Sequence, residues 1–300
     1  MKINIKKFVP EWLRGALMYG LWFLPDKAYI KLFYFAVTGR KLDLKNPVTF
    51  EDKQQWLKLN DRRERYTTLA DKYLVKDIVK EKLGEQYCFP VLGVWDKFED
   101  IDFDALPDEF VLKCNHDSGS TRVIHDKNAI TPKEMKEMKK FYKRRLRKNF
   151  FYAGREYPYK NIEHKIMAEK YMSDETQDDS GLNDYKFFCF HGVPKFVLIV
   201  SNRGKGTCYD FFDMELNRMT LTYGEHKNEN LNIDREKFNE MAQIAAKMSQ
   251  GIKFVRMDLF MVNGQVYFGE YTFFDGGGFQ WYTPEEWEYT LGDWIDLTKD

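Results

Sequence analysis

The sequence has few of the residues that build disulfide frameworks or zinc sites. It contains four cysteines, none in a C-x-x-C pair, and five histidines, none in an H-E-x-x-H motif. Cys114 and Cys189 fall within apolar, strand-like runs and are expected to be buried thiols. These absences argue against a zinc enzyme and indicate a reduced, cytoplasmic chain.

The chain also lacks a net charge. Lysine plus arginine equals aspartate plus glutamate, at 47 each, so no overall field favours nucleic acid as a partner. One basic run, 139–148, falls on a helix opened by Thr131-Pro132, and a solvated helix face explains it better than a binding site.

No apolar run is long enough to cross a membrane. The segment 15–25 is apolar and aromatic, but Pro25 and Lys27 interrupt it before the roughly 20 residues that a span needs, and no small-residue cleavage site follows. Two interpretations stay open: a core helix, or peripheral contact with the inner face of a membrane. The second depends on a group of aromatic residues, Trp22, Phe23, Phe33, Tyr34 and Phe35, around Lys27, Lys31 and Arg40.

The order of the expected elements indicates an α+β fold. Helices are expected over 1 to about 65, 70–83, 132–149 and 234–250, and strands over 109–113, 122–125, 166–172, 184–190 and 195–201. Antiparallel sheets with helices on one face fit this order, and 300 residues are enough for two or three sub-domains.

The most informative pattern is a hairpin near the C-terminus. Two alternating apolar segments, 254–261 and 265–272, are joined by Asn263-Gly264, which predicts two antiparallel strands. Each strand carries one carboxylate, Asp258 and Glu270.

The register of this hairpin decides whether the two acids meet. A strict two-residue turn pairs Asp258 with Gly269 and points Glu270 to the other face. One extra residue in the loop, as a bulge at Gly264, sets Asp258 opposite Glu270 with Cβ atoms roughly 5 Å apart. Two such acids suit a Mg²⁺ ion between them, although paired strand carboxylates are also sometimes only solvated.

Lysines near other strand and helix ends could hold a nucleotide. Lys113 ends a strand and opens onto the loop 115–121, whose hydroxyls and backbone N–H groups suit phosphate oxygens, although it is not a P-loop. Lys72, at the start of a helix, could reach the same phosphates or be a plain surface residue. The segment 169–172 ends a strand at a hinge that could grip an adenine, or it is an ordinary amphipathic strand.

Other charged residues share strand faces with one another. Arg256 lies on the face of Asp258, where it could hold an anionic reacting group or simply balance charge. Asp184 and Lys186 lie two apart on one face, where an ion pair is the simpler interpretation.

Taken in order, these segments resemble the ATP-grasp superfamily. Over nearly the whole chain, the amino-acid sequence also resembles the TupA-like branch of that superfamily, which is found in polysaccharide and teichuronopeptide biosynthesis. The segments that carry the superfamily resemblance are Asp71-Lys72, Val111-Leu-Lys113 with its Ser-Gly loop, Glu169-Lys170-Tyr171-Met172, Arg256-x-Asp258 and Glu270-x-Thr272. Those that carry the branch are Leu42-x-Leu-Lys-Asn-Pro47, Ala70-Asp-Lys-Tyr73, Phe110-Val-Leu-Lys-Cys-Asn115, Asp184-Tyr-Lys-Phe-Phe-Cys-Phe190 and Tyr267-Phe-Gly-Glu270.

The resemblance implies an ATP-grasp fold: two α+β lobes with antiparallel sheets clasping ATP, over 106–183 and 184–300, preceded by a helical region, 1–105. It implies that Lys72 and Lys113 bind the ATP phosphates and that the loop residues Ser118, Gly119 and Ser120 close over them. It further implies that Glu169, Lys170 and Met172 line the adenine and ribose, and that Asp258 and Glu270 hold Mg²⁺. Thr272 stands where the superfamily has an asparagine and is a poorer metal ligand. Lys186 stands where related ligases often carry an arginine near the γ-phosphate.

The activity implied is ATP-dependent ligation of a carboxylate to an amine through an acyl phosphate, with Arg256 and Lys186 steadying the anionic intermediate. The expected substrates are a uronic-acid carboxyl of a sugar nucleotide or glycan and a small amine, with ATP and Mg²⁺ as cofactors. Two alternatives remain. One is a glycosyltransferase, for which Asp102-Phe-Asp104 would supply an Asp-x-Asp metal motif; the other is a non-catalytic ATP-binding protein.

Overall fold

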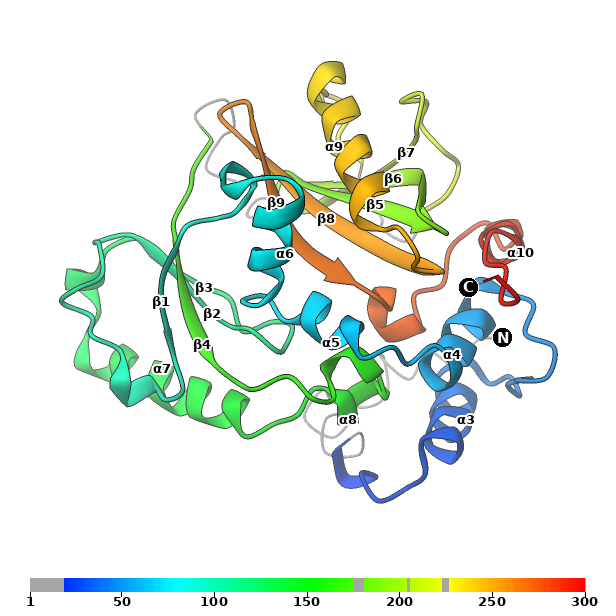
Figure 1. Cartoon of the computed structure of the whole chain (residues 1–300), viewed down its shortest axis with the longest axis horizontal. Helices are drawn as coiled ribbons and strands as arrows, with labels where there is room; N and C mark the ends of the chain where they lie inside the picture. The colour runs from blue at the N-terminus through cyan, green and yellow to red at the C-terminus, as the bar shows by residue number, and fades with distance from the viewer. Residues whose placement is uncertain (1–18, 175–180, 204–205, 223–226, 300) are drawn as a thin grey trace.

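Two antiparallel sheets organise the chain (Figure 1). The computed structural model describes residues 19–174, 181–203, 206–222 and 227–299. Within them a four-stranded sheet has the order β1-β4-β2-β3, and a five-stranded sheet has the order β7-β6-β5-β8-β9. Helices pack against both, so the expected α+β architecture is confirmed.

The smaller sheet carries one long helix on its outer face, away from the larger sheet. Its strands are β1 (Val91–Trp95), β2 (Phe110–Cys114), β3 (Arg122–Ile124) and β4 (Ile166–Lys170). The helix α7 (Pro132–Leu146) begins at a capping box between Thr131 and Glu134, with proline at its first position. Met138 and Tyr142 on α7 join a buried core with apolar residues of β2 and β4. The opposite, charged face of α7 is left to solvent.

The strand β1 falls in the region, 1–105, that was expected to be helical. Its residue Trp95 pairs with Ile166 of β4, so the smaller sheet draws on residues before 106. The strand β1 was not predicted because it is short, half-exposed and interrupted by Gly93, so its residues show no apolar alternation. The lobe boundaries themselves stay predictions.

The larger sheet is covered on one face by a single helix. Its strands are β5 (Asp184–Phe190), β6 (Val193–Ser201), β7 (Cys208–Asp213), β8 (Phe254–Val262) and β9 (Gln265–Thr272). The helix α9 (Arg235–Met248) buries Phe238, Met241, Ile244, Ala245 and Met248 in the core of this sheet. Since side chains alternate along a strand, the charged positions of β5, β8 and β9 point away from α9.

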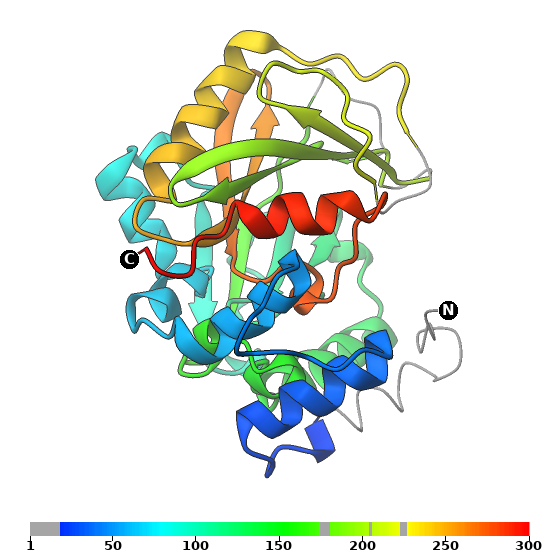
Figure 2. The same ribbon diagram turned by 90° about the vertical axis from the view of Figure 1, so that its right-hand side faces the viewer.

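The N-terminal helices lie at one side of the larger sheet. They are α3 (Asp26–Thr38), α4 (Phe50–Asn60), α5 (Arg65–Ala70) and α6 (Val75–Lys82); the short α8 (Phe151–Gly154) and α10 (Glu286–Asp293) come later in the chain. Lys53 of α4 donates to the carbonyls of Gly292 and Ile295, both at 2.9 Å, which ties α4 to the end of α10 (Figure 2). Among the described residues, no helix combines the length and apolar character needed to cross a membrane.

The helix expected over 70–83 begins late, at Val75 of α6, and a break separates it from α5, which ends at Ala70. The break falls at Asp71, whose carboxylate accepts the backbone N–H groups of Tyr73 at 2.8 Å and Leu74 at 3.1 Å. An aspartate that satisfies free N–H groups in this way starts a new helix more readily than it continues an old one. The break leaves Lys72 outside both helices.

Candidate active site

The hairpin of β8 and β9 places Asp258 directly opposite Glu270. The turn at Asn263-Gly264 is nonetheless a strict two-residue turn, with φ values of 50° and 75°. The extra residue lies inside β9, at Gly269, where the register shifts by one. The predicted meeting of the two acids is therefore confirmed, but the predicted bulge at Gly264 was wrong.

Gly269 is required at this position by close packing. A Cβ atom there would lie 2.7 Å from Cε2 of Phe260 and 2.8 Å from the backbone oxygen of Asp258. Neither contact is sterically acceptable, and the second is with backbone that cannot swing away. A residue without a side chain thus creates the bulge that brings the carboxylates together.

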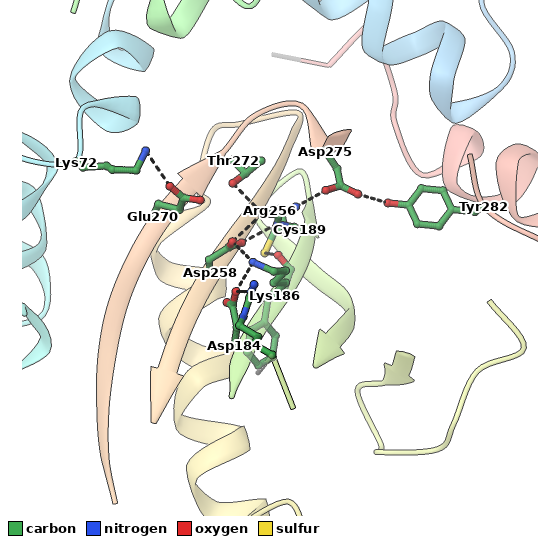
Figure 3. Close-up of polar contacts among 12 residues, drawn as sticks. Lys72, Asp184, Lys186, Cys189, Arg256, Asp258, Glu270, Thr272, Asp275 and Tyr282 are labelled. Atoms are coloured by element: carbon green, nitrogen blue, oxygen red, sulfur yellow. Dashed lines mark hydrogen bonds and ion pairs between the residues drawn. The ribbon is translucent and has the colours of Figure 1, made fainter. Parts of the chain in front are cut away.

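Asp258 is buried among basic groups at the floor of the site (Figure 3). Its Oδ1 accepts from Nε of Arg256 at 2.7 Å, and its Oδ2 accepts from Nη2 of Arg256 at 2.7 Å and from Nζ of Lys186 at 2.5 Å. Lys186 faces Asp258 across the β5–β8 pairing, and its Nζ also lies 2.6 Å from Asp184. The same-face ion pair expected of Asp184 and Lys186 is present. Asp184 is also bound by Arg203, at 2.5 Å, at the edge of the cleft.

Arg256 is fixed from the side opposite Asp258. Its Nη1 donates to Asp275, and the other oxygen of Asp275 accepts from the hydroxyl of Tyr282 at 2.7 Å. Its Nη2 donates to the hydroxyl of Thr272 at 3.1 Å, so Thr272 here supports the guanidinium. An arginine held at every nitrogen presents a fixed positive field to the cleft rather than a mobile side chain.

Glu270 receives its counter-ion from another part of the chain. Nζ of Lys72 lies 3.0 Å from Oε2 of Glu270 and donates to the carbonyl of Asp117 at 2.8 Å. The backbone N–H of Lys72 donates to the carbonyl of Asn115 at 3.1 Å. Lys72 thus connects the loop after β2 to the acidic hairpin.

A second buried carboxylate, Glu169 on β4, binds two lysines. Nζ of Lys113 lies 2.6 Å from one of its oxygens, and Nζ of Lys76 lies 2.7 Å from the other. Lys76 also donates to the carbonyl of Phe89 at 3.0 Å. Nothing in the sequence marks Lys76 as a partner of Glu169, apart from its position four residues after Lys72 in a segment with helical spacing.

The loop after β2 is held in shape by its own side chains. Ser120 is buried, and its hydroxyl accepts from the N–H of Cys114 at 2.9 Å and donates to Asp117 at 2.5 Å. Gly119 adopts φ of 81°, which favours glycine, and the carbonyl of Ser118 accepts from Arg145. Ser120 therefore holds the loop in shape from within, and its part in closing over a phosphate stays a prediction.

A cleft of 1220 Å³ lies between the two sheets, lined by residues of both. Ten of the predicted site residues line it: Lys72, Lys113, Ser118, Glu169, Lys170, Met172, Lys186, Arg256, Asp258 and Glu270. Gly119, Ser120 and Thr272 are not among its lining residues in the described part of the chain. The roles of all these residues in binding and catalysis stay predictions.

The two facing carboxylates, Asp258 and Glu270, are ionised at neutral pH. Burial raises the pKa of Asp258, but Arg256 and Lys186 outweigh this effect and hold that pKa below its ordinary value. Burial likewise opposes the ionisation of Glu270, yet Lys72 leaves the pKa of Glu270 lowered. Within the described residues no group of three or more His, Cys, Asp or Glu side chains is arranged for a metal. Two ionised carboxylates fit Mg²⁺, which binds to one or two carboxylates together with substrate phosphates.

Glu169 is expected to make stability depend on pH. Burial raises its pKa, but Lys113 and Lys76 hold that pKa below the ordinary 4.5. The stabilisation is complete above pH 4.5 and is lost as pH falls from there through the lower folded-state pKa, because the unfolded chain takes up the proton first. Glu169→Gln should lower the free energy of unfolding at neutral pH by about 3 kcal/mol, since two lysines lose their buried partner. It should also flatten the loss of stability on the acid side.

Urea unfolding followed by tryptophan fluorescence, at a series of pH values, measures both effects. Glu99→Gln is the matched control, because Glu99 binds Lys139 and Lys143 at the surface and should matter little. An unchanged acid slope in Glu169→Gln would contradict the assignment.

Comparison with known proteins identifies the family. The family model described as TupA-like ATPgrasp matches residues 52–296. No curated protein matches the chain.

Several solved structures that are similar to this chain are ligases, and their sequence identity to it is low. The ATP complex of D-alanine–D-alanine ligase from Bacillus anthracis is 16% identical over 68% of this chain and 53% of its own, with a TM-score of 0.39, so this chain spans about half of that ligase. The ATP-grasp ligase PsnB, complexed with a minimal precursor, is 10% identical over 81% of this chain and 66% of its own, with a TM-score of 0.42. D-alanine–D-alanine ligase from Helicobacter pylori is 13% identical over 82% and 69%, also with a TM-score of 0.42. Because these TM-scores lie below 0.5, the assignment rests on the family model. The chain belongs to the TupA-like ATP-grasp family.

Proposed function

We propose that this protein is an ATP-dependent ligase that joins a carboxylate to an amine through an acyl phosphate. The observation that carries the proposal is the row of charges at the floor of the cleft, where Arg256 and Lys186 both contact Asp258 while Glu270 lies beside it. Lys72 and Lys113 line the same cleft from the other side. This is the charge arrangement that transfer of a phosphoryl group to a carboxylate requires, since such a reaction depends on positioning and charge neutralisation.

The proposed reaction has two steps, transfer of a phosphoryl group and displacement of phosphate by the amine. A carboxylate oxygen of the substrate attacks the γ-phosphorus of ATP, the bond to the ADP oxygen breaks, and an acyl phosphate forms. The amine then attacks the acyl carbon, the bond to phosphate breaks, and the amide, phosphate and one proton are released.

Each cluster of the site has a part in these steps. Lys72 and Lys113 bind phosphate oxygens, and the fixed guanidinium of Arg256, with Lys186, stabilises the anionic intermediate. Asp258 and Glu270 would hold Mg²⁺, which neutralises phosphate charge when bound. Lys170 and Met172, at the end of β4, would contact the adenine, and Ser118 would contact a phosphate.

We propose a uronic-acid carboxyl of a bacterial surface polysaccharide, or of its nucleotide- or lipid-linked precursor, as the acid, and an amino acid or amino alcohol as the amine. Support comes from the sequence resemblance to the TupA-like branch, which is found in polysaccharide and teichuronopeptide biosynthesis; the family model itself matches residues 52–296. The glycosyltransferase alternative finds no support in the position of its candidate motif. Asp102 is exposed outside the cleft, and its carboxylate accepts the backbone N–H groups of Asp104 at 3.1 Å and Ala105 at 3.3 Å, as in an ordinary turn.

The deciding experiment is a screen of uronic acids against amines with ATP and Mg²⁺, scoring ADP and phosphate. Release that depends on both substrates, with an acyl phosphate trapped by hydroxylamine when the amine is omitted, supports the ligase. UDP release from a UDP-sugar without ATP would establish the glycosyltransferase instead. Nucleotide binding with no turnover of any pair would favour a non-catalytic ATP-binding protein.

A further inference from the structure

The outer face of α3 and the turn before it present large apolar side chains to solvent. Trp22 is 63% exposed, Phe23 is 64%, Leu32 is 50% and Phe35 is 58%. Leu32 and Phe35 are three apart on the helix and therefore share one face. Not all the aromatic residues of this segment belong to it: Tyr34 is buried in the core beneath α3 together with Tyr29 and Ile30, and Phe33 packs against that core.

The exposed charges of α3 itself are of one sign, and the exposed acid Asp43, in the loop after α3, lies near enough to interact with Lys31. Lys27 and Lys31 are exposed and lie on the same side of α3 as Leu32 and Phe35. The acid of α3, Asp26, is turned to Arg62, at 2.8 Å, and to the buried Arg155. Among the described residues of α3 no acidic side chain is therefore exposed beside these lysines.

The end of α7 adds further positive charge next to this face. Nζ of Lys148, just beyond α7, lies 4.9 Å from the ring centre of Tyr19, which comes just before the exposed aromatics. Arg144, Arg147 and Lys148 are all exposed. Both helices lie along the lower side of the molecule in the two views (Figures 1 and 2).

We propose that this face, defined by Trp22, Phe23, Lys27, Lys31, Leu32 and Phe35, is a docking surface for a membrane that contains anionic phospholipids. Exposed aromatic and aliphatic side chains enter the boundary between headgroups and acyl chains, while lysines bind the headgroup phosphates. A second copy of the chain fits this face less well, because a two-fold contact would bury the same positively charged face of both copies, and α3 offers no exposed acid to pair with the lysines. The inference does not depend on the ligase reaction.

Co-sedimentation of the full chain with vesicles tests the proposal. We expect binding to vesicles of equal parts phosphatidylglycerol and phosphatidylcholine, weak binding to phosphatidylcholine alone, and a decline with added salt. Trp22→Ser with Phe23→Ser, and separately Lys27→Glu with Lys31→Glu, should each weaken binding by about tenfold or more. All four positions are exposed, so folding should be preserved, as a thermal melt can verify.

Matched substitutions elsewhere on the surface provide the control. Tyr289→Ser on α10 and Lys195→Glu on β6 remove an exposed aromatic and an exposed lysine, and both should bind vesicles like the parent chain. Equal binding by all variants, or equal binding to neutral and anionic vesicles, would overturn the proposal. So would a concentration-dependent dimer, seen by analytical ultracentrifugation without lipid, that the Trp22 and Phe23 substitutions abolish. Ligase activity on soluble substrates should be unaffected by these changes, which separates this test from that of the proposed function.

Discussion

Asp258→Asn is expected to reduce turnover by about a hundredfold to a thousandfold while leaving a folded protein. The amide keeps the shape of the side chain but removes the negative charge that Arg256 and Lys186 share. One half of the amide is also a donor and would face these donors directly. Folding stability should fall as well, by about 2–3 kcal/mol, because Arg256 and Lys186 each lose one of two acidic partners and keep only Asp275 and Asp184.

Asp210→Asn separates the catalytic effect from the structural one. Asp210 is a buried aspartate of β7 in the same sheet, it binds Arg218, and it is not among the residues lining the cleft. Both variants should melt at lower temperature, but only Asp258→Asn should lose ATP turnover in the substrate screen. Substantial activity in Asp258→Asn, or an equal loss in Asp210→Asn, would remove the proposed role from Asp258.

Gly269→Ala is the second change with a large expected effect. The added methyl group would meet Phe260 and the backbone oxygen of Asp258, so β9 must shift relative to β8. Overpacking of this kind costs about 1–3 kcal/mol of stability. Turnover should fall by about a hundredfold, because a displacement of roughly 1 Å between Asp258 and Glu270 spoils the geometry of the site.

The same hairpin supplies the control for this substitution. Gly264 has φ of 75° but open space around it, so Gly264→Ala strains the turn without touching the acids. It should cost about 1 kcal/mol of stability and leave turnover unchanged. Thermal melts and ADP release, measured on both variants, test the contrast. Equal turnover in Gly269→Ala and the parent chain would show that the bulge does not set the geometry of the acids.

The sequence predicts those parts of the site that follow from local periodicity. Alternation along single strands placed Asp184 with Lys186 and Arg256 with Asp258, and the Asn-Gly turn located the hairpin. The position of the bulge was not predictable, because it depends on the ring of Phe260 packing over Gly269 in the folded hairpin.

Contacts between segments that are distant in the sequence could also not be predicted. Nothing in the spacing of Asp275 and Tyr282 shows that they hold Arg256, and Lys76 shows no sign of its partner Glu169. Such pairs form only when the two sheets and their helices assemble, and the sequence pattern of a single element carries no record of them. The same reason accounts for β1, whose strand character comes from pairing with β4.

The ion pair of Lys72 with Glu270 has a consequence for the order in which ligands enter. Lys72 and Glu270 are each other's counter-ion, so a bare anion that binds Lys72 leaves Glu270 without its partner, and a bare cation that binds Glu270 leaves Lys72 without its own. A ligand that carries both positive and negative charge can replace the partner of Lys72 and the partner of Glu270 at the same time. Under the proposed function, the protein should therefore favour a preassembled metal–nucleotide complex over either component arriving alone.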